Sequence, residues 1–161
     1  MTAKADFNAE EWSTLVQAPL LAAMHVAAAE RGGTIRESLA AARAYTEARQ
    51  HQGTSPLLDA IVASPPALDP SQIQQAGAGI AGHAKEQLRQ ATGIVDAKAS
   101  SAEGSAYKQF ILTVAEAAAN ANREGGFVGI GGKPVSANEQ AALDEIRAAL
   151  ALEAPGPERA A

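Results

Sequence analysis

The sequence predicts an all-α fold, a single-domain bundle of five or six helices in which two helical hairpins share one design. The 161 residues fit one domain. The hydrophobic fraction is 47% with only 4% aromatics, so small apolar residues dominate, and alanine is the strongest helix former. Apolar residues recur at helical spacing between capping residues and Gly or Pro breaks. We expect 1–7 to be a flexible N-terminus, 8–152 the helical domain and 153–161 a flexible tail.

The first helix is predicted to begin at Asn8, because Glu11 three residues later completes a capping box. Pro19 lies inside this segment, so the helix either kinks there or restarts with Pro19 in its first turn. Gly32-Gly33 end it. The apolar positions at helical spacing are Trp12, Leu15, Val16, Leu20, Ala23, Met24 and Ala27.

The second and third helices also have clear start signals. Thr34-x-x-Glu37 is a second capping box, and Ser55 caps a short helix with Pro56 at its first position. The predicted apolar stripe of the second helix is Ile35, Leu39, Ala42 and Tyr45.

The fourth helix is predicted to start at Asp69-Pro70. Gly77, Gly79 and Gly82 lie in its first half, and each costs about 1 kcal/mol relative to alanine. We expect these glycines to let another helix approach closely. The predicted buried face is Ile73, Ile80, Ala84, Leu88, Ala91 and Val95.

The fifth helix, at about 105–124, follows a predicted loop at 99–105 and has the clearest amphipathic pattern. A Gly-rich loop at 125–134 leads to the last helix, which Ser136-x-x-Glu139 caps. The inward positions are Tyr107, Phe110, Ile111, Val114, Ala118 and Ala121, then Leu143, Ile146 and Leu150.

Segments 8–50 and 105–152 both place an alanine-rich helix before a double glycine and a helix-opening Ser/Thr-x-x-Glu after it. Duplication of one hairpin and convergence of capped hairpins both account for this. The design resembles the TerB-like helical proteins of tellurite resistance, which implies a small-ligand or metal-binding stress-response protein. In that family an acidic residue commonly lies beside the turn glycine, and only Glu124 keeps it here, since Arg31 holds the other place. Segment 125–132 is also similar to segments of bacterial all-helical proteins, which implies no function.

Charge and composition exclude several classes of protein. The net charge of −5 argues against a nucleic-acid partner, and the absence of cysteine excludes disulfides and thiolate sites. We find no apolar run of the roughly 18 residues that a membrane helix needs, and no signal-peptide core near the N-terminus. We therefore expect a cytoplasmic protein with no membrane partner.

The sequence offers only weak metal ligands. Asn120, Asn122 and Glu124 fall at positions one, three and five of a calcium loop, but Gly131 stands where the bidentate glutamate is needed. Glu139, at the helix-opening position, is the fourth candidate. The 125–134 loop does not match a phosphate-binding pattern, so no cofactor is predicted.

The histidines and the single tryptophan have plainer interpretations. His25 and His83 lie on predicted helices, and His51 lies in a polar turn. His83-x-x-Glu86 offers two ligands one turn apart in a single copy, so a surface or partly buried histidine is the better interpretation. Trp12 is either a partner anchor or part of the core, and the scarcity of aromatics favours the core.

No motif predicts catalytic residues. The first functional hypothesis is a non-enzymatic helical interaction or scaffold domain, with a second copy or another protein as its partner. The alternative is the metal-binding or small-ligand protein that the TerB-like resemblance implies. An enzyme is a third hypothesis without named residues.

Overall fold

The computed structural model describes residues 2–29, 35–50, 53, 55–64, 79–121 and 135–152, with the side chains of 35–39 excepted. Over these ranges it contains a 3-10 turn, Lys4–Asp6, six α-helices and no strand, which confirms the all-α prediction. The helices are α1 (Ala9–Ala29), α2 (Ile35–Gln50), α3 (Pro56–Ala63), α5 (Ile80–Lys98), α6 (Ser101–Ala121) and α7 (Ala137–Ala149).

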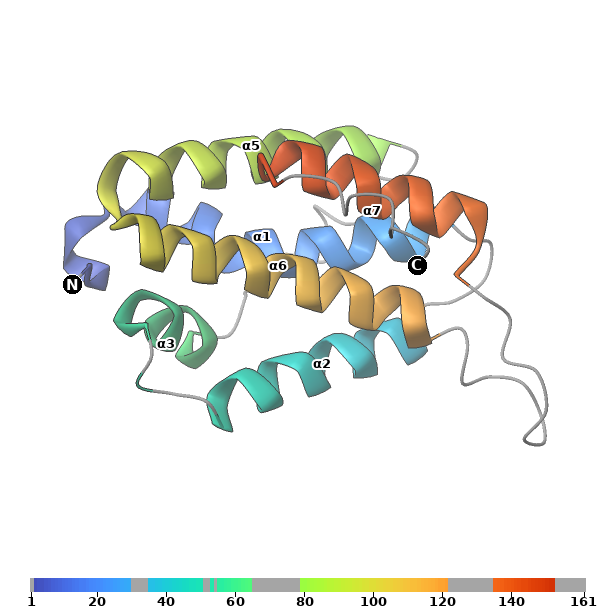
Figure 1. Cartoon of the computed structure of the whole chain (residues 1–161), viewed down its shortest axis with the longest axis horizontal. Coiled ribbons are helices and arrows are strands. Elements are labelled where there is room, and N and C mark those ends of the chain that lie inside the picture. Colours follow the sequence, from blue (N-terminus) through green and yellow to red (C-terminus); the bar gives the residue numbers. More distant parts are fainter. Residues whose placement is uncertain are drawn as a thin grey trace, which may run out of the picture.

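Helices α1 and α6 run side by side through the middle of the bundle (Figure 1). Helices α5 and α7 cover one side of this pair, and α2 and α3 cover the other. The most extensive contacts are those of α1 with α6 and α5, and of α2 with α6. Helix α2 packs more on α6 than on α1, whereas α7 packs more on α1 than on α6. The outer helix of each predicted hairpin therefore packs more on the central helix of the other hairpin than on that of its own.

Helix α1 is buried around most of its circumference. Four of the predicted inward residues are buried, namely Trp12, Leu15, Val16 and Ala23, and three are only half-buried, namely Leu20, Met24 and Ala27. Ala18, Ala22 and Val26, which were not predicted, are fully buried. By length and composition alone α1 is apolar enough to cross a membrane, with a mean hydropathy of 1.2, contrary to the expectation from the sequence. Its place at the centre of the core accounts for that composition.

Proline 19 lies in the middle of α1, and the helix continues through it without restarting. Proline has no N–H to donate to the carbonyl of Leu15, four residues earlier. The hydroxyl of Tyr107, on α6, donates to that carbonyl at 2.8 Å instead. The neighbouring helix thus satisfies the acceptor that Pro19 leaves free.

Three of the predicted helix caps are confirmed. The Asn8 side chain accepts from the Glu11 amide at 2.9 Å, and Glu11 accepts from the Asn8 amide at 2.8 Å. Ser55 accepts from the Leu58 amide with Pro56 in the first turn. Ser136 and Glu139 form the reciprocal capping box of α7.

The loop predicted at 99–105 is wrong, because α6 begins at Ser101. Ser100 and Glu103 form a capping box that the small polar residues around them concealed. The Ser100 hydroxyl lies 3.4 Å from the Glu103 amide, and the Ser100 amide donates to the Glu103 carboxylate at 3.3 Å. The inward face of α6 is otherwise as predicted from Tyr107 to Ala118.

One further expectation needs correction. Ala42 is exposed, and among the described side chains of α2 the buried ones are those of Ala41, Ala44 and Tyr45. In the N-terminal segment Thr2 and Phe7 are buried, and the flexibility of that segment stays a prediction. The predicted signals at 32–34, 69–70 and 125–134, together with Ile73, lie outside the described residues.

Within the chain, no other helix packs closely on the described glycines of the predicted fourth helix. A Cβ added at Gly79 or Gly82 would meet no heavy atom within 4 Å in the described structure. Gly79 is the N-cap of α5, and Gly82 lies exposed in its first turn. Gly77 lies outside the described residues.

Helix α7 ends in a Schellman motif with alanine in the position that glycine usually holds. Ala151 has φ +52°, and its amide donates to the Ala148 carbonyl at 3.2 Å. The Leu152 amide donates to the Arg147 carbonyl at 2.9 Å. This pair of bonds defines the motif, and the left-handed conformation strains a residue that carries a Cβ.

Replacing Ala151 with glycine should therefore stabilise the protein by about 0.5–1 kcal/mol, because relief of the strain outweighs the added freedom of the unfolded chain. The matched control is Ala141→Gly, at an exposed position inside α7, which should cost about 1 kcal/mol. Urea melts at constant m-value measure both. Equal destabilisation by the two changes would contradict the strain at Ala151.

Candidate functional site

One polar cluster of the described structure joins α1, α5 and α7 around a buried histidine. His25, on α1, is buried, and its Nε2 lies 2.9 Å from Oε2 of Glu145 on α7. Lys85, on α5, places its Nζ 3.4 Å from the same oxygen. One carboxylate oxygen therefore joins three helices.

The carboxylate of Glu145 orients the ring of His25. Burial raises the pKa of Glu145, but the hydrogen bonds from His25 and Lys85 outweigh it, and the pKa is lowered overall. Because Glu145 is then ionised at neutral pH and can only accept, Nε2 of His25 carries the hydrogen of the bond between them. Its Nδ1 is buried with no hydrogen-bond partner in the part of the chain that the structure describes.

The hydrogen bond and the ion pair of this cluster are of the kind that stabilises the packing of helices. A metal site needs several His, Cys, Asp or Glu side chains, and the described residues contain no group of three or more that could hold an ion. His25 was identified from the sequence, whereas Glu145 and Lys85 were missed. The 120 residues between His25 and Glu145 leave no local pattern that predicts the pair.

Two of the weak metal candidates, Asn120 and Glu139, lie among the described residues. Asn120 is exposed near the end of α6. Glu139 is buried, and its carboxylate accepts from the Ser136 amide in the α7 cap. Asn122 and Glu124 lie outside the described residues, so the calcium-loop interpretation stays a prediction.

The other histidine and the tryptophan are placed as the preferred interpretations predicted. His83 and Glu86 are both exposed on α5, and Glu86 pairs with Arg89 at 3.9 Å. Trp12 is buried, with its ring centroid 5.9 Å from that of Phe7. His51 lies outside the described residues.

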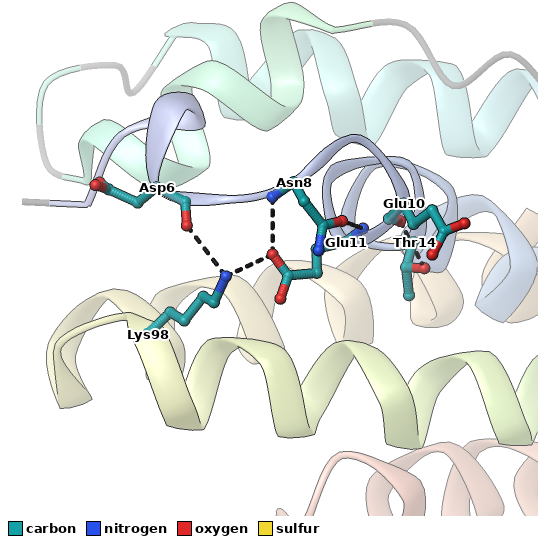
Figure 2. A network of polar contacts seen from close by, with 6 residues as sticks. All are labelled: Asp6, Asn8, Glu10, Glu11, Thr14 and Lys98. Carbon is teal, nitrogen blue, oxygen red and sulfur yellow. Dashed lines mark hydrogen bonds and ion pairs between the residues drawn. The ribbon is translucent and has the colours of Figure 1, made fainter.

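A second polar network joins the start of α1 to the end of α5 (Figure 2). Lys98 Nζ donates to Glu11 Oε2 at 2.6 Å and to the Asp6 carbonyl at 3.2 Å. The Lys98 hydrogen bond, followed by that of the Asn8 amide, lowers the pKa of Glu11. The sequence predicted the Asn8–Glu11 cap but missed Lys98, whose only local signal is a basic residue in the last turn of a helix.

Two shallow hollows lie on the described surface. One of about 390 Å³ lies between α1 and the end of α3, with Trp12 and Lys4 in its wall. The other, of about 280 Å³, lies beside the α5–α6 turn and is lined by Ser101, Ser105 and the Lys108–Asp96 ion pair. In the second hollow both oxygens of Asp96 accept from the Lys108 ammonium, at 2.7 and 2.9 Å.

The outer face of α5 is unusual because two glycines interrupt it. Gly82 and Gly93 are exposed, and a Cβ at either would meet no heavy atom within 4 Å in the described structure. They are eleven residues apart, which is about three helical turns and places both on one face. Glu86 and Arg89 lie between them, with side chains 60% and 63% exposed.

No protein-family model, curated protein or solved structure matches this chain. The TerB-like resemblance therefore stays a hypothesis drawn from the sequence.

Proposed function

We propose that this chain is a non-enzymatic helical interaction domain that associates with a second copy of itself through the outer face of α5. The observation that carries the proposal is the pair of open glycines, Gly82 and Gly93. Each lowers helix stability by about 1 kcal/mol relative to alanine, and no described contact within the chain uses the missing side chain. A close approach by another helix gives these glycines a role.

Charge favours a second copy as the partner. In a two-fold interface the same patch faces itself, so a residue of one copy meets a different residue of the other. Glu86 and Arg89 lie one turn apart between the two glycines. Antiparallel α5 helices would then pair Glu86 of each copy with Arg89 of the other. We propose the cytoplasm as the location.

The test is the double change Gly82→Ala with Gly93→Ala. We expect it to stabilise the monomer by about 1–2 kcal/mol, since both methyl groups enter open space. Urea melts at low protein concentration measure this gain. The same methyl groups should weaken self-association in sedimentation equilibrium. Gly104→Ala is the matched control, because its Cβ would face Val95 and Asp96 of the same chain at 3.8–3.9 Å.

A charge exchange provides a second check. Glu86→Arg alone should weaken association, and adding Arg89→Glu should restore it. A wild-type chain that stays monomeric at every soluble concentration would contradict the proposal. So would a Gly82→Ala, Gly93→Ala chain that associates as tightly as the wild type.

A further inference from the structure

We propose that Thr2–Asn8 form a strap that opens as a unit and controls whether the indole of Trp12 faces solvent. The strap crosses from the α5–α6 turn to the start of α1, and its contacts are concentrated at its two ends. This inference does not depend on self-association, because it concerns the single chain.

At the far end the strap is held by a buried carboxylate. Glu103 Oε1 accepts from the Thr2 amide at 2.8 Å, and Oε2 accepts from the Thr2 hydroxyl at 2.9 Å. The Ser100 hydroxyl donates to Oε2 at 2.7 Å. Glu103 and Thr2 are only 7% and 6% exposed, so this anchor is shielded from water.

At the near end the strap lies against Trp12. The Phe7 ring packs on the indole, and Lys4 places its ammonium 5.5 Å from the centre of that ring. Lys98 holds the end of the strap through the Asp6 carbonyl (Figure 2). Its ammonium also lies 5.7 Å from the centre of the Phe7 ring. The Phe7 and Lys4 side chains therefore leave the indole with the strap when it opens.

Between the two anchors the strap makes few buried contacts. Ala3, Lys4, Ala5 and Asp6 are all exposed, and Phe7 is the only large side chain of the strap that is buried. Segments with few buried apolar contacts and exposed hydrogen bonds open at much lower free energy than the core. Trp12 itself belongs to α1, whose Leu15 and Val26 are fully buried, so the indole stays in place while the strap moves.

Two variants distinguish the bonds between Glu103 and Thr2 from the capping box that Glu103 forms with Ser100. Glu103→Gln keeps the capping box, because glutamine serves at that position, but it replaces one acceptor oxygen with a donor. Ser100→Ala removes the cap hydroxyl and leaves both Thr2 bonds. We expect Glu103→Gln to speed hydrogen exchange at residues 2–8 by about tenfold, the effect of one hydrogen bond of about 1.4 kcal/mol. Ser100→Ala should change it much less.

Trp12 provides an independent readout because it is the only tryptophan. Acrylamide should quench its fluorescence more strongly in Glu103→Gln than in Ser100→Ala, with helix content unchanged. Thr2→Val, which removes only the hydroxyl donor, should also increase the quenching of Trp12. The proposal is overturned if residues 2–8 exchange only with global unfolding, if the two main variants behave alike, or if quenching does not change.

Discussion

Replacing Tyr107 with phenylalanine should lower the free energy of unfolding by about 1–3 kcal/mol, although the change removes a single oxygen atom. Tyr107 is fully buried, and burial raises the pKa of its phenol well above the usual value, so the group stays neutral. Its hydroxyl supplies the hydrogen bond that the Leu15 carbonyl loses to Pro19. Without that donor, a buried acceptor is left without a partner. Urea melts at constant m-value measure the loss.

Tyr45 is a matched control for this change. It is also buried, and burial raises its pKa, but its hydroxyl has no hydrogen-bond partner among the described residues. Tyr45→Phe should therefore be neutral or stabilise the protein by up to about 1 kcal/mol, because it removes an unsatisfied buried group. Similar losses from both tyrosines would point to packing as the cause and contradict the hydrogen-bond account.

A double-mutant cycle with Pro19→Ala tests the mechanism itself. Alanine restores an N–H at position 19, which can bond the Leu15 carbonyl within α1. Tyr107→Phe should then cost less in the Pro19→Ala background than in the wild type. The coupling between the two positions should be about 0.5–3 kcal/mol, as for residues that share one partner. Additive effects would show that Pro19 and Tyr107 act independently.

The helix starts show what local chemistry can predict. Asn8, Ser55 and Ser136 each cap a helix through contacts within three residues, so the signal lies inside a short window. The inward faces of α5, α6 and α7 follow from the helical period for the same reason. Ser100-x-x-Glu103 has the same pattern as Ser136-x-x-Glu139 and could have been found. The run of small polar residues around it favoured a loop instead.

Central burial is what the helical period fails to predict. In α1 the predicted stripe included Leu20 and Met24, which are only half-buried, and missed Ala18 and Ala22, which are fully buried. A helix surrounded by neighbours has no single apolar stripe. Alanine allows close contact between helices, but its spacing in this helix does not show which face makes the contact. The glycines of α5 show the same effect, since composition cannot tell whether a missing side chain faces a helix of the same chain or the surface.

The candidate sites depend on long-range pairs, which a single sequence does not reveal. Glu145 lies 120 residues from His25, and Glu103 lies 101 residues from Thr2. In the sequence, each of the two glutamates resembles an ordinary exposed charge on a helix. The two carboxylates meet their partners only when the helices pack together. The sequence alone therefore does not predict the contact of Glu103 with Thr2 or that of Glu145 with His25.

Acid should destabilise this protein through Glu103 more than through an ordinary surface carboxylate. The hydrogen bond from the Thr2 amide, followed by that from the Ser100 hydroxyl, lowers the pKa of Glu103 from 4.5 to about 2, although burial opposes this. A folded-state pKa below the unfolded value means that the unfolded chain binds the proton more readily. The stabilisation is therefore complete above about pH 4.5 and is lost as the pH falls toward 2. Its size is about 2–3 kcal/mol.

Glu103→Gln isolates this contribution from the other acids. Glu11 and Glu145 also have lowered pKa values, and both remain in the variant, so their effects cancel in the comparison. The wild type should be more stable than Glu103→Gln by about 2 kcal/mol at pH 6. The difference should shrink as the pH approaches 2, where Glu103 loses its charge and the two chains become nearly equivalent. Urea melts at several pH values between 3 and 7 measure this convergence. A stability difference that stays constant over that range would show that the charge of Glu103 does not anchor Thr2.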